Sequence, residues 1–332
     1  MNPILDVADG TNVRLFSLAR YALFEALRVI GISPGQKILV PAFICRDLLA
    51  SIHAVKGIPM FYPVDRLLAP QSLLAMPDVK AIIAVNYFGF PQTLGPFRAY
   101  CAEHGASLIE DNAHGFLSRD EQGTLLGSRG DIGIVSLRKT ISIPDGAALL
   151  LNRSEWVDRL PAPLPCRGDP LPARFIVKRA LSQIQNATGV RARTLGEKMT
   201  RGFRRLLTGR ALPISLPESE FEIPGDPAIH CVSLEMLGKI DAANEVNRRR
   251  ALYQDFHRDL RHLNIEPIFG DLPVGVAPYG YPFRADESGA ATVAGLAQEK
   301  GFDCSYWPDL PSEVAPGAPD HYRNVLWINF QC

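Results

Sequence analysis

The stretch Ser107-Leu-Ile-Glu-Asp-Asn-Ala-His114 joins a short apolar run to a cluster of acidic, amide and imidazole side chains. A second stretch, Gly133-Ile-Val-Ser-Leu-Arg-Lys139, repeats this arrangement, with a serine and a lysine after the apolar residues. Short continuous apolar runs are typical of strands buried on both faces of a parallel sheet. Because the carboxyl ends of parallel strands meet at one edge, the sequence predicts one cleft in which a carboxylate, an imidazole and a lysine converge.

Similar apolar runs lie on both sides of these stretches and alternate with helical patterns. The runs of strand length are residues 37–41, 59–62, 81–85, 106–109, 132–135 and 147–151. Helical spacing of apolar residues predicts helices over 14–30, 44–55, 94–103, 232–263 and 290–300. This alternation predicts an α/β fold with a mainly parallel sheet flanked by helices.

Composition excludes several classes of protein. Of 332 residues, 47% are hydrophobic and 21% charged, which excludes a disordered chain and a coiled coil. The formal net charge is zero, so we expect no nucleic-acid partner, and no apolar run is long enough to span a bilayer. The six cysteines lack metal-ligand spacing and no signal peptide opens the sequence, so we expect no metal, inert cysteines and a cytoplasmic location.

Charge is distributed unevenly along the chain. Residues 153–210 hold thirteen Lys and Arg against four Asp and Glu, a net charge of +9 that leaves −9 for the remainder. Proline-rich stretches flank this segment. We therefore predict three regions: a large α/β domain over 1–152, a basic helical excursion over 153–227, and a small carboxyl-terminal α+β domain over 228–332.

The basic segment 174–210 has three interpretations. Apolar residues recur in it at helical spacing beside Arg and Lys. Such a pattern occurs in a solvated helical excursion packed on the small domain. It also occurs in an interfacial helix on an anionic membrane surface, or in a site for an acidic carrier protein or a phosphorylated substrate.

A carboxylate, an imidazole and a lysine in one cleft are what a pyridoxal phosphate enzyme needs. Lysine supplies the amine for a Schiff base, and an acid keeps the pyridine nitrogen protonated so that the ring can accept electrons. Spacing alone does not identify the cofactor. By pattern alone, Asp111 could instead cap a turn, His114 could be a core residue, and Lys139 could lie in a solvated loop.

Six stretches, read in order, resemble one known family. They are residues 32–43, 85–91, 104–114, 127–131, 135–146 and 232–250, and the resemblance as a whole spans about residues 14 to 330. The series resembles the DegT/DnrJ/EryC1/StrS family of pyridoxal-phosphate-dependent aminotransferases. The resemblance implies a fold-type-I architecture, with a mainly parallel seven-stranded sheet flanked by helices and a smaller carboxyl-terminal α+β domain.

The resemblance also implies roles for particular residues. Lys139 would bond covalently to pyridoxal phosphate, Asp111 would bind the pyridine nitrogen, and both would be catalytic. The other expected cofactor contacts are His114 near the ring hydroxyl, Ser136 and the backbone of Ala19 and Arg20 at the phosphate, and Tyr87 or Phe88 against the ring or in the substrate cleft. The implied protein is a homodimer that moves an amino group from an amino acid, glutamate above all, to a ketone or aldehyde of a sugar or secondary metabolite.

Two alternatives remain open at this point. Only two residues separate Ser136 from Lys139, fewer than in the family, which favours another outcome with the same cofactor, such as elimination, racemisation or condensation. Ala19-Arg20 stands where the family has glycine-threonine, which is compatible with a non-catalytic scaffold that has lost the cofactor.

Overall fold

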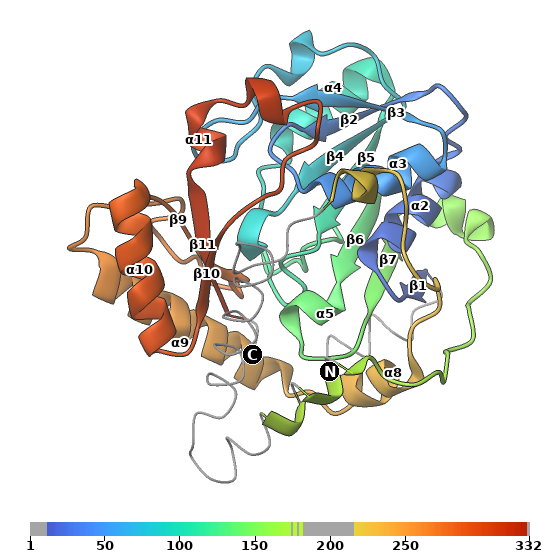
Figure 1. Ribbon diagram of the computed structural model, residues 1–332. Helices are drawn as coiled ribbons and strands as arrows, with labels where there is room; N and C mark the ends of the chain where they lie inside the picture. The colour runs from blue at the N-terminus through green and yellow to red at the C-terminus, as the bar shows by residue number, and fades with distance from the viewer. Residues whose placement is uncertain (1–11, 174, 178, 182–215, 331–332) are drawn as a thin grey trace.

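Seven strands form one large sheet (Figure 1). The computed structural model describes residues 12–173, 175–177, 179–181 and 216–330. In chain order the strands are β1 (Val13–Phe16), β2 (Lys37–Pro41), β3 (Ile58–Tyr62), β4 (Ala81–Val85), β5 (Ser107–Asn112), β6 (Ile132–Ser136) and β7 (Ala147–Leu151). Across the sheet the order is β1-β7-β6-β5-β4-β2-β3. The four pairs from β6 to β3 are parallel, and β7 pairs antiparallel with β6 and β1. The predicted mainly parallel seven-stranded sheet is confirmed.

Helices flank this sheet. They are α2 (Ala19–Ile30), α3 (Leu49–Ala54), α4 (Gly95–His104) and the single turn α5 (Leu137–Thr140). The buried face of α2 packs on β6 and β7, and α4 packs on β4 and β5. Helix α2 ends at Gly31, whose left-handed backbone (φ 83°) is a conformation that glycine adopts at little cost.

The helix predicted over 14–30 is wrong in its first turn. Residues 13–16 form β1, because their backbone groups complete a ladder with β7 at the edge of the sheet. The chain stays extended at Leu18 (φ −134°, ψ 147°), and α2 begins after it. Apolar residues at 15 and 18 therefore face different neighbours from those that a continuous helix would give them.

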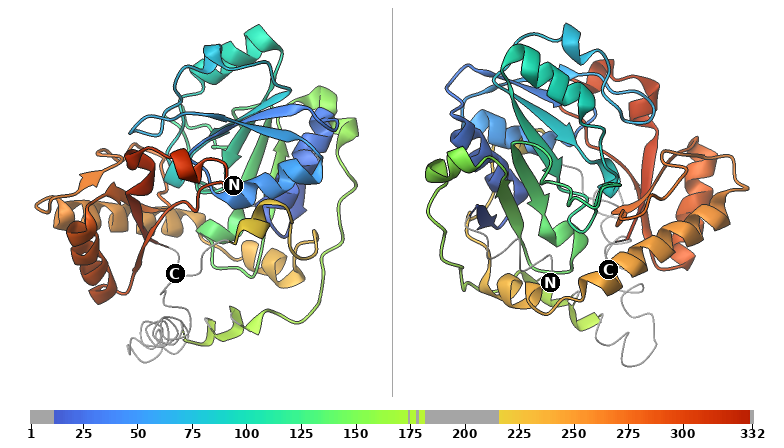
Figure 2. Two further views of the ribbon diagram at one scale, coloured as in Figure 1. Left: turned by 45° about the horizontal axis from the view of Figure 1, so that its top comes forward. Right: turned by 180° about the vertical axis from the view of Figure 1, so that it is seen from behind.

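A second, smaller sheet follows towards the carboxyl end (Figures 1 and 2). Its order is β10-β11-β9-β8, all antiparallel, with β8 (Glu266–Pro267), β9 (Gly280–Arg284), β10 (Asp303–Tyr306) and β11 (Val325–Asn329). The helices of this region are α8 (Cys231–Leu237), α9 (Ala242–Leu260), α10 (Glu287–Glu299) and α11 (Asp320–Arg323).

Short 3₁₀ turns occur along the whole described chain. They are η1 (Arg46–Leu48), η2 (Leu73–Ala75), η3 (Tyr87–Gly89), η4 (Ser154–Arg159), η5 (Pro217–Glu220) and η6 (Ala315–Gly317).

The single helix predicted over 232–263 is two helices. The chain leaves the helical path after Leu237, and the Asp241 carboxylate accepts a hydrogen bond from Asn244 N at 3.0 Å as the cap of α9. An aspartate at this position satisfies a helix N–H that would otherwise lack a partner, so it favours a new helix start.

The two sheets share one buried core. Side chains of β4 and β5 belong to the same apolar cluster as those of β9 and β11. Because the cluster is continuous, the second sheet is packed on the first by apolar contacts as well as by the chain that joins them. This packing decides which carboxyl-terminal residues can reach the edge of the large sheet.

The prediction of inert cysteines is wrong for one pair. Cys166 and Cys231 form a disulfide with a Cα–Cα distance of 5.0 Å, which joins the segment after η4 to the start of α8. Cys45, Cys101 and Cys304 are free thiols. The sequence offered no spacing signal for the bond, because its partners are 65 residues apart.

Most of the basic segment 174–210 lies outside the described residues, so its three interpretations stay predictions. Among the helices of the described ranges, none combines the length and apolar character needed to cross a membrane.

Candidate functional site

The floor of the candidate site is made by the ends of three neighbouring strands. In the parallel register, Asp111 of β5 lies between Val85 of β4 and Ile134 of β6. All three line one pocket. Successive strand residues point to opposite faces, so Glu110 points away and binds Arg129 at 2.6 Å. The alternation thus separates a carboxylate that faces the pocket from one that stabilises the fold.

Asp111 is a buried carboxyl group at this floor. Its Oδ1 accepts a hydrogen bond from Ala113 N at 2.8 Å. Burial raises its pKa, against the opposing effects of that hydrogen bond and of Lys139. A buried carboxylate of this kind gains most from a cationic N–H partner placed in the pocket.

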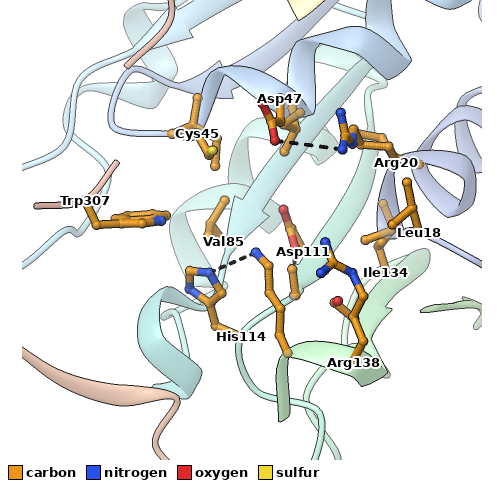
Figure 3. A pocket seen from close by; sticks show the side chains of 17 residues that line it. Leu18, Arg20, Cys45, Asp47, Val85, Asp111, His114, Ile134, Arg138 and Trp307 are labelled. Atoms are coloured by element: carbon orange, nitrogen blue, oxygen red, sulfur yellow. Dashed lines mark hydrogen bonds and ion pairs between the residues drawn. The ribbon is translucent and has the colours of Figure 1, made fainter. Parts of the chain in front are cut away.

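Lys139 and His114 meet beside Asp111 (Figure 3). The Lys139 Nζ lies 3.2 Å from His114 Nε2, and Phe88 N donates to His114 Nδ1 at 3.3 Å. With Nδ1 accepting, a neutral His114 carries its proton on Nε2 and donates it to Lys139. Burial lowers the pKa of Lys139, and burial together with Lys139 lowers the pKa of His114 well below 6.5. Both directions favour a neutral pair, in which the lone pair of the Lys139 amine accepts the hydrogen bond from His114.

The opposite end of the pocket carries positive charge. Ala19 and Arg20 open α2 there, and Arg20 pairs loosely with Asp47 at 3.9 Å. Ser136 ends β6 and Arg138 belongs to α5, and both line the same pocket. The amino end of a helix presents N–H groups to an anion, and two guanidinium groups strengthen that preference.

The structure brings six of the eight predicted site residues to this pocket. They are Ala19, Arg20, Asp111, His114, Ser136 and Lys139. Tyr87 and Phe88 are not among the lining residues. They are 2% and 0% exposed, and the Tyr87 hydroxyl donates to the carbonyl of Phe43 at 2.7 Å. Phe88 reaches the site only indirectly, by its contacts with His114 and Trp307, because η3 turns both rings into the core.

Sequence reasoning missed Trp307, which closes one side of the pocket (Figure 3). It follows β10 of the second sheet, and its ring centroid is 5.2 Å from that of His114. Its N donates to Val325 O at 3.0 Å, which ties it to β11. No local pattern marks it, because only the packing of the two sheets brings it here.

Cys45 also lines the pocket, and burial raises its pKa to about 11, so it is a thiol at neutral pH.

The amino-terminal sequence matches a known family over the elements that build this pocket floor. Residues 16–162 match the model of the DegT/DnrJ/EryC1/StrS aminotransferase family. The family resemblance expected from the sequence is confirmed for these residues. The DegT/DnrJ/EryC1/StrS region runs from β1 through η4 and contains every predicted site residue.

Solved structures extend the likeness to nearly the whole fold. The aminotransferase TlmJ from Streptoalloteichus hindustanus is 20% identical with a TM-score of 0.66, covering 98% of this chain and 84% of TlmJ. Helicobacter pylori PseC, an aminotransferase involved in pseudaminic acid biosynthesis, is 14% identical with a TM-score of 0.62, covering 98% and 89%. The E. coli GDP-4-keto-6-deoxy-D-mannose-3-dehydratase, solved with hydrated PLP, is 15% identical with a TM-score of 0.61, covering 96% and 84%. These likenesses establish the fold-type-I architecture, including the second sheet.

Proposed function

We propose that this chain is a pyridoxal-phosphate-dependent aminotransferase that moves an amino group from an amino acid, glutamate above all, to a ketone or aldehyde of a sugar or secondary metabolite. The observation that carries the proposal is the Lys139–His114 contact of 3.2 Å beside the buried Asp111. The family match supports the reaction class. The E. coli neighbour with bound PLP supports the cofactor.

The pocket residues fit this cofactor in charge and in order. Asp111 would hold the pyridine N–H, His114 would lie near the ring hydroxyl, and Lys139 would bond to the aldehyde carbon. Ser136 and the first backbone N–H groups of α2 would hold the phosphate. The fit rests on two observations. Burial raises the pKa of Asp111, so its ionised form is favoured only when a cationic group lies beside it, and Arg20 and Arg138 line the end of the pocket where the phosphate would lie.

When bound, the cofactor supplies an electron sink for a negative charge that develops on the substrate carbon. Lys139 Nζ would be the base that removes the proton from that carbon and later returns one. The lowered pKa of Lys139 keeps it unprotonated for this task at a lower pH than an exposed lysine. His114 Nε2–H would orient the amine, and the Asp111 carboxylate would keep the pyridine nitrogen protonated.

A second outcome with the same cofactor is favoured by two observations. Ser136 ends β6 and the single turn α5, which carries Lys139, begins at the next residue, so Lys139 is held close to Ser136. One structural neighbour is a dehydratase. Elimination, racemisation or condensation would use the same Lys139 and Asp111 but would not leave the amino group on the cofactor.

We also propose a homodimer, a three-region division at about residues 152 and 227, and a cytoplasmic location. The dimer and the location are expectations from family resemblance and composition. The Cys166–Cys231 bond bears on the location, because structural disulfides are rare in a reducing compartment, where such bonds are usually transient.

Spectroscopy with pyridoxal phosphate tests the cofactor first. We expect a visible absorption band when pyridoxal phosphate binds covalently, and borohydride should fix the cofactor on Lys139, as read by peptide mass spectrometry. Glutamate should then shift the band to shorter wavelength if the reaction is transamination. A folded but colourless protein with unmodified Lys139 would favour the non-catalytic scaffold. A coloured protein that no amino donor converts would favour the other outcomes.

A further inference from the structure

The Cys166–Cys231 disulfide lies beside the loop that follows Lys139. Cys166 is exposed and Cys231 is half-buried, so small thiols can reach the bond. Their neighbours form a short parallel bridge, in which Arg167 N donates to Ile229 O and Cys231 N donates to Arg167 O, both at 2.9 Å. The covalent bond and this bridge together fasten residues 166–169 to the start of α8.

We propose that Cys166 and Cys231 are a thiol–disulfide modification site that controls the rigidity of the Lys139 turn. The oxidised form holds the turn in the geometry seen here, and the reduced form loosens it. The inference concerns residues that the proposed function does not use.

Asp145 is the first link between the bond and the site. It is 6% exposed, and its Oδ2 accepts from Arg167 Nη2 at 2.5 Å. Its Oδ1 accepts from Ser233 Oγ at 2.7 Å and from His230 N at 3.1 Å. Each oxygen therefore depends on a residue next to, or close to, one of the two cysteines. A buried carboxylate that loses a charged partner is destabilised. The position of Asp145 therefore depends on how firmly Arg167 is held beside it.

Gly146 is the second link. Its carbonyl accepts from Leu137 N at 3.0 Å and from Arg138 N at 3.2 Å, and its own N donates to Ser17 O at 2.8 Å. These hydrogen bonds fasten α5, which carries Lys139, to the residue directly after Asp145. A contiguous path of covalent and hydrogen bonds thus runs from the disulfide through Arg167, Asp145 and Gly146 to the Lys139 turn.

A dithiol reduces the bond by thiol–disulfide exchange, in which atoms and electrons balance. A thiolate of the dithiol attacks the exposed Cys166 Sγ and the Cys231 thiolate leaves, with a mixed disulfide formed at Cys166. The second thiol of the reductant then displaces Cys166, so two electrons pass to the protein and the reductant becomes a cyclic disulfide. Oxidation by a small disulfide such as glutathione disulfide reverses both steps. After reduction, Arg167 is held near Asp145 only by non-covalent contacts, which water can reach because its side chain is 24% exposed.

The first test is independent of any cofactor. Hydrogen exchange of the peptide covering residues 137–146 should be at least about fivefold faster in the dithiothreitol-reduced protein than in the glutathione-disulfide-oxidised protein, as for a coupling of 1 kcal/mol or more. Peptide mapping with a thiol label should show Cys166 and Cys231 changing state together. Equal exchange rates in the two forms would overturn the proposal.

Three variants separate the bond from its path. Cys231→Ser should exchange at the reduced rate under both conditions. Cys304→Ser, which removes a thiol of the second sheet, should keep the full redox response. Arg167→Gln should keep the disulfide but show a smaller response, because it removes the Asp145 Oδ2 contact and leaves the Oδ1 contacts with Ser233 and His230 in place. A response of unchanged size in Arg167→Gln would exclude Arg167 from the path.

A second readout rests on the proposed function. The dissociation constant of pyridoxal phosphate should rise at least about fivefold on reduction, and in Cys231→Ser to the same value. A protein that binds no cofactor yet shows the exchange difference would contradict the proposed function and keep the switch. A protein that binds the cofactor equally in both states, with no exchange difference, would contradict the switch alone.

Discussion

Lys139 and His114 show how burial prepares two ordinary side chains for chemistry. Burial lowers the pKa of Lys139, and burial together with the nearby Lys139 lowers the pKa of His114. Both shifts favour the neutral forms of two groups that share one hydrogen bond. Asp111 on β5 is the buried carboxyl group of the pocket, and a cationic group of the ligand would stabilise its ionised form.

Replacing Asp111 by Asn tests its role directly. The variant should fold and bind pyridoxal phosphate, because the amide keeps the shape of the carboxylate. Its half-reaction with glutamate should slow by about a hundredfold or more, because a neutral amide cannot keep the pyridine nitrogen protonated. Stopped-flow absorbance measures the rate. Turnover near that of the unaltered protein would move the acid role to another residue.

His114 predicts a pH dependence of stability. Its pKa in the folded protein is well below 6.5, so the unfolded chain binds more protons in the window below pH 6.5. Stability therefore falls as the pH falls through that window, by up to about 1.4 kcal/mol per pH unit for this one proton. His114→Gln should lack this contribution. Urea unfolding between pH 7.5 and 5 measures both proteins, and parallel profiles would contradict the prediction.

Four of the pocket residues, Asp111, His114, Ser136 and Lys139, could be predicted because each lies at or just after the end of an apolar strand. Asp111 and Ser136 end neighbouring strands of a parallel sheet, which must place them at one edge. Tyr87 follows a strand too, yet η3 turns it into the core. Strand position predicts that a residue is near the edge, but the backbone of the next turn decides where its side chain points.

Among the elements, β6 shows how closely the sheet is packed behind the pocket. A Cβ added to Gly133 would lie 1.8 Å from Gly127 O, which is backbone and cannot move aside cheaply. The site depends on this strand, since β6 leads directly into the Lys139 turn.

We expect Gly133→Ala to destabilise the protein by at least about 3 kcal/mol, because the clash requires the strand to shift. Gly295→Ala is the control. That glycine lies within α10, and a Cβ added to it would meet no atom within 4 Å, so the change should stabilise the protein by about 0.5–1 kcal/mol. Thermal unfolding followed by circular dichroism compares the two, and a Gly133→Ala protein as stable as the original would contradict the packing argument.

Element boundaries were harder to predict than element types. The apolar spacing over 14–30 suits a helix throughout, but β7 offers an edge that residues 13–16 complete as a strand. The spacing over 232–263 is continuous, while Asp241 starts a new helix within it. In both places a partner distant in sequence, or a single cap, outweighs local periodicity.

At the scale of the molecule, the two sheets complete the site together. Trp307 is tied to β11 by backbone hydrogen bonding and contacts His114, which follows β5 of the large sheet. Its ring also lies 5.3 Å from that of Phe43, within the shared core. A residue that reaches the site only through packing between sheets has no signature in its own segment, which is why the sequence did not indicate it.

Charge separation along the chain leads to the last prediction. A segment of net charge +9 in a protein of zero net charge should attract an anionic surface at low salt and release it as the Debye length falls from about 10 Å at 0.1 M to about 3 Å at 1 M. Replacing Arg201, Arg204 and Arg205 by Gln should therefore weaken sedimentation with anionic vesicles, and binding to an acidic carrier protein, without changing the cofactor spectrum. The matched control replaces three exposed arginines outside the segment, Arg28, Arg98 and Arg323, and should bind as the original does. If the unaltered protein binds neither partner at low salt, the segment is a solvated flank, because its charge alone is then insufficient to hold an anionic surface.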